Sequence, residues 1–333
     1  MRTSTDRSVQ PATRKRLWLA AQLLFGAAIV SFAVRELVQQ WAGAEHELRQ
    51  LSPRWTAIAL SSVIVLSSYA LLIAAWRGML GAWNASLSFG DAAHIWFVSN
   101  LGRWVPGKVW QIAAMGAMAR QRGVPAAAAA GSSIVVNLAS IVSGFALVLL
   151  TGSSVLDASA RGGRALATIL VVGVTALLLV LPALLPVVAR LAARVTGRPM
   201  ALPRIPARAL WLAVTSTAVA WLLYGTAFAL FTRGIVVGST GSIPGVVPAF
   251  VAVYTGSYLA GYLALFAPGG IGVRESVLIV MMPALGLATP AQALVIGLAS
   301  RLWLTVLEVV PGLLFLAWGP LRRLPRTTDD AAT

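Results

Sequence analysis

The chain has no cysteine and only two histidines, and charged residues make up 11% of its 333 residues. Without cysteine there is no disulfide framework and no thiol chemistry, and His46 and His94 are too few and too far apart for a metal cluster. No Gly-rich phosphate loop follows a strand, because no segment has a convincing strand pattern. We therefore expect a protein that is not an enzyme and that has neither a cofactor nor a metal site.

Apolar residues take the place of the missing charge. They make up 58% of the chain, and the mean hydropathy is +0.82, whereas soluble domains carry about 25% charged residues. Several runs exceed the roughly 18 apolar residues that are typical of a membrane helix. These runs predict six full spans, at residues 17–34, 55–79, 125–151, 165–189, 209–232 and 290–318. The expected fold class is therefore an all-α polytopic membrane protein.

Two further apolar regions are interrupted. Residues 92–119 are broken at Pro106 and Gly107, and residues 247–287 are broken at Pro268, Gly269 and Gly270. Proline removes a backbone donor and glycine frees the backbone, so both sequences interrupt a helix. The arms of the first region have about a dozen residues, which is too short to cross about 30 Å of hydrocarbon. Each region is predicted to be a re-entrant hairpin with its Pro-Gly tip in the membrane, although the second also fits two full spans.

The net charge of +16 indicates membrane topology rather than nucleic-acid binding. With both termini in the cytoplasm, sixteen Lys and Arg residues lie on inside segments and six on outside segments, as the positive-inside rule requires. Residues 1–16 and 319–333 are then cytoplasmic tails around a transmembrane domain at 17–318. Reading the second broken region as two full spans gives the same parity, so charge does not decide between the two readings.

The order of elements repeats with reversed polarity. A span, a hairpin and a span occupy about residues 55–151, and the same series occupies about residues 209–318. Interrupted segments at corresponding places in two halves are typical of transporters with inverted repeats and a substrate site near the bilayer midplane. The sequence thus predicts an inverted repeat with the two Pro-Gly tips close to such a site.

Ionisable residues at membrane depth are the main candidates for that site. They are Arg103, Lys108, Arg274, Glu275, Arg301 and Glu308. Each costs at least about 2.5–3.5 kcal/mol in a membrane unless it has a partner or a wet cavity. Pairing within the bundle would neutralise some of these charges, but four basic residues against two acidic ones leave an excess of two positive charges. Helix starts after each Pro-Gly also favour an anion, so an anion-recognising cavity is the sharper hypothesis.

Two motifs resemble a known family. The stretches Gly102–Trp110 (GRWVPGKVW) and Ala267–Glu275 (APGGIGVRE) are similar to the lysylphosphatidylglycerol synthase transmembrane-region family, the flippase-like part of bacterial multiple peptide resistance factors. The likeness covers about residues 15–318 in span order. It implies movement of a phospholipid or another lipid-linked headgroup between leaflets. Synthase activity is not expected, because no aminoacyltransferase domain follows the spans. At residues 135–138 this chain reads VVNL, where family members often have an acidic residue and an arginine.

The prediction is a flippase or transporter in the bacterial cytoplasmic membrane that moves a phospholipid or lipid-linked anionic headgroup. The basic pair at the first tip is expected to receive a phosphate from the cytoplasmic side, with Arg274 and Arg301 on the outer route. Glu275 and Glu308 would orient these side chains, bind an amine, or act as the coupling carboxylate of an ion-driven small-anion transporter, which is the main alternative. Another alternative is a non-catalytic subunit that supplies a lipid carrier to a glycosyltransferase. Membrane lipids are the expected partners and nucleic acid is not; a homo-oligomer and a glycosyltransferase or aminoacyltransferase partner stay open.

Overall fold

The computed structural model describes residues 53–104, 109–152, 206–236, 243–264 and 268–318, and within these ranges every regular element is a helix and none is a strand. The α-helices are α2 (Trp55–Gly81), α3 (Phe89–Asn100), α4 (Val109–Arg120), α5 (Ala126–Thr151), α8 (Ala207–Ile235), α9 (Ile243–Leu263), α10 (Val273–Ala284) and α11 (Pro290–Trp318). Two short 3₁₀ turns, η1 (Leu101–Trp104) and η2 (Pro268–Gly270), interrupt the series. The all-α prediction is confirmed for this part of the chain.

Four of the six predicted spans are confirmed as long apolar helices: α2, α5, α8 and α11. The predicted spans at 17–34 and 165–189, and the predicted tails at 1–16 and 319–333, lie outside the described residues. Residues 246–263 of α9 form a fifth helix that is long and apolar enough to cross a membrane. Helix α9 belongs to the second broken region. One arm of that region is therefore longer than a short re-entrant arm needs to be.

The helix breaks fall where the sequence predicts them. In the first region, α3 and α4 have 12 residues each and η1 follows α3, so the prediction of two short arms is confirmed; Pro106 and Gly107 lie outside the described residues. In the second region, α9 has 21 residues and α10 has 12. Gly269 and Gly270 have φ values of +59° and +69°, a conformation that glycine adopts without steric cost, and this ends the helical path.

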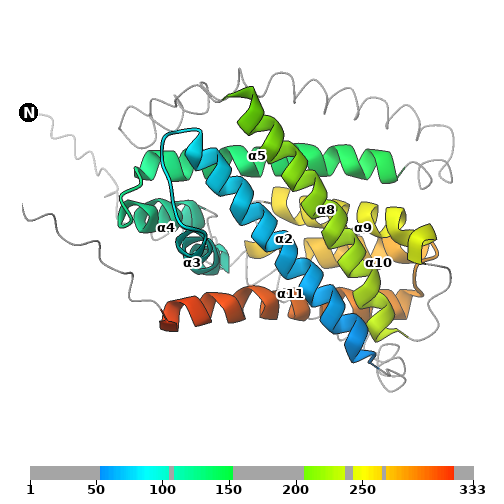
Figure 1. The fold of residues 1–333 in the computed structure, drawn as a ribbon. Helices are drawn as coiled ribbons and strands as arrows, with labels where there is room; N and C mark the ends of the chain where they lie inside the picture. Colours follow the sequence, from blue (N-terminus) through cyan, green and yellow to red (C-terminus); the bar gives the residue numbers. More distant parts are fainter. Residues whose placement is uncertain (1–52, 105–108, 153–205, 237–242, 265–267, 319–333) are drawn as a thin grey trace, which may run out of the picture.

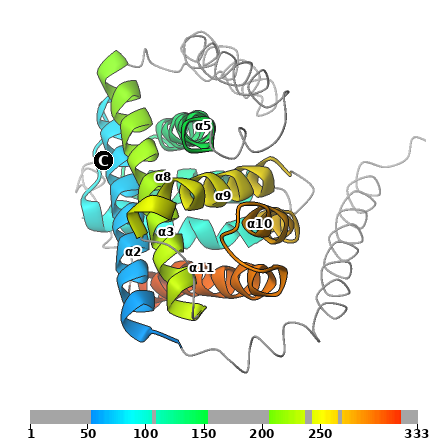
Figure 2. The same cartoon turned by 90° about the vertical axis from the view of Figure 1, so that its right-hand side faces the viewer.

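The helices cross in two directions. Helices α2 and α8 lie side by side and antiparallel (Figure 1), and the Arg54 N–H at the start of α2 donates to the Gly234 carbonyl at the end of α8 over 2.8 Å. The other helices run across this pair. Both views place α5 and α11 on opposite sides of the broken helices (Figures 1 and 2). The two breaks η1 and η2 contact each other at the centre of this arrangement.

Small and hydroxyl-bearing residues allow this packing in an apolar sequence. A side-chain carbon at Gly225 of α8 would lie 2.5 Å from the Val251 Cα of α9, so the two helices approach within backbone contact there. Serine hydroxyls on α2, such as those of Ser62 and Ser68, donate to carbonyls four residues earlier. These bonds satisfy the hydroxyls without water, as the interior of a membrane requires.

Candidate functional site

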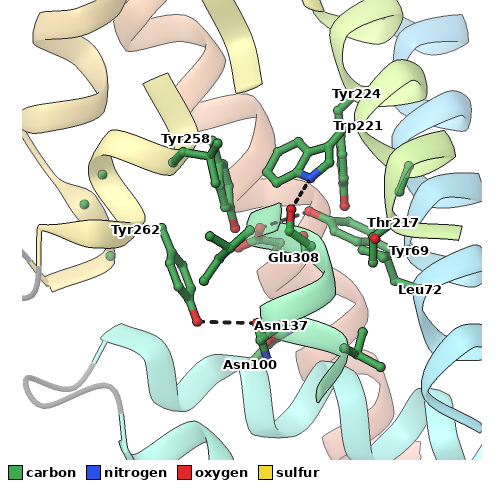
Figure 3. Close-up of a pocket in the computed structure, with 18 of the residues that line it drawn as sticks. Tyr69, Leu72, Asn100, Asn137, Thr217, Trp221, Tyr224, Tyr258, Tyr262 and Glu308 are labelled. Carbon is green, nitrogen blue, oxygen red and sulfur yellow. Dashed lines mark hydrogen bonds between the residues drawn. The ribbon is translucent and has the colours of Figure 1, made fainter. Parts of the chain in front are cut away.

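A cavity of about 190 Å³ lies inside the helix bundle beside η2, and the end of α3 and the start of α4, on either side of the first break, also line it. Every one of the chain's five tyrosines lines it: Tyr69, Tyr224, Tyr254, Tyr258 and Tyr262. They come from three helices, α2, α8 and α9, and Figure 3 shows Tyr69, Tyr224, Tyr258 and Tyr262 around the same space. Tyrosine combines an apolar ring with a polar hydroxyl. The tyrosines therefore give the cavity wall aromatic surfaces together with several hydrogen-bonding groups.

The second break forms one wall of the cavity through a glycine contact. Gly270 packs on Gly261 of α9 so closely that a side-chain carbon at Gly270 would lie 2.9 Å from the Gly261 backbone. Gly261, Gly269 and Gly270 all line the cavity. This contact holds η2 against α9 and places the start of α10, which carries Arg274, beside the cavity.

Arg274 is a buried cation without a carboxylate partner among the described residues. Its side chain is 4% exposed and lines the cavity. The guanidinium lies 5.3 Å from the centre of the Tyr254 ring, and its only hydrogen bond to this part of the protein is a long one, 3.4 Å, to the Ser300 hydroxyl. The Nε atom of Arg274 is buried and makes no hydrogen bond there. Arg274 therefore has donors available for an anion in the cavity.

Arg301 is held differently, by groups on the second break. Its guanidinium donates to the Gly269 carbonyl over 2.9 Å and lies 3.5 Å from the Glu275 carboxylate. The other carboxylate oxygen of Glu275 accepts the Gly272 N–H over 2.8 Å at the start of α10. Arg301 lines the cavity and Glu275 does not. The arrangement ties η2 and α10 to α11, so Glu275 serves as a helix cap and counter-ion for Arg301.

Glu308 lies on the same wall, two turns along α11 from Arg301. It is 6% exposed, lines the cavity, and accepts a hydrogen bond of 2.9 Å from the Tyr69 hydroxyl (Figure 3). The seven-residue spacing on α11 thus brings Arg301 and Glu308 to one helical face, as the sequence predicts. The tyrosine hydroxyl thus gives this buried carboxyl group a hydrogen-bond partner inside the bundle.

The wall formed by α3, α4 and α5 carries amides in place of charges. The Gln111 amide donates to the Asn100 amide oxygen, and the Tyr262 hydroxyl donates to the Asn137 amide oxygen over 3.5 Å (Figure 3). Nearby, the Trp221 indole donates to the Ser140 carbonyl over 2.9 Å. The amides and the arginines therefore lie on different elements around one cavity.

The structure brings together part of the site predicted from sequence. Arg274, Arg301 and Glu308 line one cavity with Gly269 and Gly270, and Pro268 begins η2 beside them. Glu275 does not line the cavity, because capping α10 and pairing with Arg301 direct its carboxylate elsewhere. The side chain of Arg103 and all of Pro106, Gly107 and Lys108 lie outside the described residues, so their roles stay predictions.

Sequence reasoning undervalued the aromatic part of the site. The sequence offers Tyr254 and Tyr258 only as weaker candidates for the cavity, because a polar residue in a span more often makes an ordinary interhelical hydrogen bond. Taken singly, Tyr69, Tyr224 and Tyr262 give no indication of the site. A signal was present, because Tyr254, Tyr258 and Tyr262 are spaced by four and so share one face of a helix. Tyr69 and Tyr224 are single residues on separate spans, and no local spacing could have brought them to this cavity.

Comparison with known proteins agrees with the membrane fold. The family described as the lysylphosphatidylglycerol synthase TM region matches residues 19–312, and a search of curated proteins finds no match. The match covers both broken regions and all of the described helices except the last residues of α11. The chain is thus a multi-pass membrane protein that belongs to the lysylphosphatidylglycerol synthase transmembrane-region family, a family related to lipid handling.

Proposed function

We propose that this protein is a flippase or transporter, not an enzyme, that moves a phospholipid or another lipid-linked anionic headgroup between the leaflets of a bacterial cytoplasmic membrane. The observation that carries the proposal is Arg274, a guanidinium that is 4% exposed, borders a cavity and has no carboxylate partner among the described residues. The headgroup phosphate would occupy the cavity beside it.

The energetics of Arg274 favour an anionic ligand. Burying an arginine at the middle of a membrane helix costs about 2.5–3.5 kcal/mol on insertion scales. The contact with the Tyr254 ring returns about 2 kcal/mol at a desolvated site, and the long bond to the Ser300 hydroxyl adds little. A phosphate can accept two charge-assisted hydrogen bonds from a guanidinium, each contributing about 1.5–3 kcal/mol. An anion thus offsets the remaining cost, and an empty cavity does not.

The surroundings of the cavity favour a lipid-linked anion. Tyr262 lines the cavity and is also 36% exposed, so the cavity reaches the outer surface of the bundle near this residue. The next residue, Leu263, is 52% exposed. In a bilayer this surface meets acyl chains, because α9 is long and apolar enough to cross the membrane. A phospholipid could therefore keep its tails outside the bundle while its headgroup reaches Arg274.

The packing of the helices supports an inverted repeat with two re-entrant elements. Helix α5 packs on α9, and α11 packs on α3 in the corresponding way, although α5 packs broadly on α8 and α11 only touches α2. Likewise α4 packs on α5, and α10 packs on α11. Exchanging the two halves therefore reproduces several of the contacts, with η1 against η2 and α2 against α8 at the centre. In such a repeat the headgroup site lies between the halves, and rocking of one half against the other would expose it to each leaflet in turn.

The charge bias of the loops supports the orientation, with both termini in the cytoplasm. In that orientation, Arg103 and Lys108 at the first tip would meet a phosphate that enters from the cytoplasmic leaflet. Arg274 and Arg301 would meet it on the outer part of the route. Glu275 keeps Arg301 in place in this mechanism, and Glu308 orients Tyr69.

A leaflet-exchange assay tests the proposal. Purified protein in liposomes that contain fluorescent anionic or zwitterionic phospholipids should accelerate lipid movement between leaflets. Arg274→Met should lower the rate for anionic lipid at least tenfold, since one or more charge-assisted bonds are lost. Arg208→Met is the matched control, because Arg208 is exposed at the start of α8 and does not line the cavity; its rate should equal that of the wild type.

Three outcomes would contradict the proposal. Folded protein that moves no lipid but takes up a small anion under an ion gradient would favour an ion-coupled transporter, with Glu308 as the candidate coupling group. Protein that moves neither, and that co-purifies with a glycosyltransferase, would favour a subunit that supplies a lipid carrier. Equal lipid rates for wild type and Arg274→Met would show that the cavity arginine does not bind the headgroup.

A further inference from the structure

Helices α5 and α9 pack closely along one half of their contact. A side-chain carbon at Gly256 of α9 would lie 3.9 Å from the Val148 side chain of α5, and one at Gly152, which follows α5, would lie 3.8 Å from Ala252 of α9. The two helices therefore run antiparallel, and their glycines let the backbones approach each other. None of these four residues lines the cavity. This half of the contact is filled.

Along the other half, the cavity borders both helices. Asn137 and Ser140 line it from α5, and Tyr258 and Tyr262 line it from α9. A pair of side chains joins the helices here, because the Tyr262 hydroxyl donates to the Asn137 amide oxygen over 3.5 Å (Figure 3). The pair lies at the surface of the bundle, since Tyr262 is 36% exposed. It therefore stands where the cavity meets the surrounding lipid.

The two partners of this bond are held differently. The Asn137 amide nitrogen donates to the Ser133 carbonyl over 2.9 Å and lies 3.4 Å from the Ser133 hydroxyl, so α5 itself orients the amide and leaves its oxygen for Tyr262. Tyr262 is the second-last residue of α9, beyond the close contacts with α5. A bond of 3.5 Å is near the upper limit for a hydrogen bond and is broken at low cost. The pair can therefore separate without unpacking the bundle.

We propose that Tyr262 and Asn137 form a lateral gate, through which a lipid headgroup passes between α5 and α9 while the acyl chains stay outside the bundle. The inference rests on the proposed function, because it assumes that the cavity takes a lipid headgroup, and it adds the route of entry. The end of α9 moves away from α5 when the gate opens, and the glycine contacts hold the other half in place. Gly261, next to Tyr262, packs on Gly270, so the same movement shifts the wall that carries Arg274.

The absence of cysteine from the chain makes the gate directly testable. In Ser140→Cys the new thiol is the only one, and it lies on the cavity wall. With full-length protein in liposomes, a phospholipid that carries a maleimide on its headgroup should label this thiol slowly. Adding Tyr262→Ala should make labelling at least about threefold faster, because the bond and the ring that hold the gate closed are lost. Leu263→Ala is the matched control, since Leu263 is 52% exposed and does not line the cavity; it should leave the labelling rate unchanged. Equal labelling with and without the Tyr262 side chain would overturn the gate, whether or not the protein moves lipid.

Locking the gate is the second test. The variant Asn137→Cys/Tyr262→Cys carries one thiol on each side of it. A short bifunctional thiol reagent that joins them should stop lipid movement, and cleavage of the reagent should restore the rate. The same reagent in Val148→Cys/Gly256→Cys should leave the rate unchanged, because α5 and α9 stay in contact there.

The outcomes separate the gate from the proposed function. Lipid movement at the unlocked rate in the crosslinked gate variant would overturn the gate and leave the proposed function standing. Protein that moves no lipid even before crosslinking would contradict the proposed function, and the labelling rates of Ser140→Cys would then decide on the gate by themselves.

Discussion

Arg274 and Arg301 line the same cavity, but replacing them should have different effects on stability. Arg274 has a ring contact and one long hydrogen bond to the described residues. Arg301 donates a hydrogen bond to the Gly269 carbonyl and pairs with the Glu275 carboxylate. We predict that Arg274→Met leaves the free energy of unfolding within about 1 kcal/mol of the wild type, because relief of about 2.5–3.5 kcal/mol of burial cost nearly offsets the loss of about 2 kcal/mol of cation–π contact.

Arg301→Met should instead lower the free energy of unfolding by about 3–5 kcal/mol, the range for breaking one partner of a buried pair. The carboxylate of Glu275 then stays buried without its cation, since its side chain is 12% exposed. Restoring neutrality with the double variant Arg301→Met/Glu275→Gln should recover part of the loss, because the amide oxygen of the new side chain would still accept the Gly272 N–H that caps α10.

The assay is equilibrium unfolding in mixed micelles with increasing denaturing detergent, monitored by the loss of helical circular dichroism, alongside lipid movement in liposomes. Arg274→Met should be stable but inactive towards anionic lipid, the signature of a residue that serves a ligand. Equal destabilisation of Arg274→Met and Arg301→Met would refute the reasoning, since Arg274 would then be held by an internal partner as Arg301 is.

Two further predictions concern the frame of the site. Gly270→Ala should destabilise the fold by about 2 kcal/mol or more and slow lipid movement, because its φ is positive and the new carbon would lie 2.9 Å from the Gly261 backbone. The control is Gly286→Ala, which has a φ of +64° but nothing within 4 Å and should lower the free energy of unfolding by only about 1 kcal/mol. Equal losses of stability in the two variants would contradict the importance of the Gly270–Gly261 contact. Trp303→Phe should lower the free energy of unfolding by about 1 kcal/mol, because the 2.9 Å hydrogen bond from the indole to the Ser62 hydroxyl is lost. The rate of lipid movement should not change. A lower rate of lipid movement would instead place this tryptophan on the lipid route.

Much of the fold follows from one-dimensional features. Long apolar runs predict α2, α5, α8 and α11, because a membrane span must satisfy its backbone internally and so must be a helix. The Pro-Gly pairs predict the breaks, because proline lacks a donor and glycine reaches positive φ. The sequence leaves open whether the second broken region is a hairpin or two full spans, and α9 has the length of a full span. Pro248 is the sixth residue of α9, where it removes one backbone hydrogen bond without ending the helix.

The candidate site was predicted less completely. Charges at membrane depth stand out in any sequence, so Arg274, Arg301 and Glu308 were found from their rarity alone. Glu275 stands out for the same reason, as an acidic residue at membrane depth expected to orient the arginines. Neighbours on a helix point about 100° apart, and its carboxylate caps α10 and pairs with Arg301 instead of lining the cavity. The tyrosines were undervalued because a tyrosine in a membrane span has several ordinary roles.

The sequence by itself determined that this chain is a helical membrane protein, where its long spans and its breaks lie, and which charges need an explanation. These properties depend on hydropathy, on backbone restrictions and on the cost of charge in lipid, and each acts over a few neighbouring residues. Only the tertiary structure decided that η1 meets η2, that five tyrosines from three helices surround one cavity, and that Arg301 has a carboxylate partner where Arg274 has none among the described residues. These are relations between residues far apart in the sequence, such as Tyr69 and Glu308, which are 239 positions apart and share a hydrogen bond. They arise from helix packing, which no local pattern encodes.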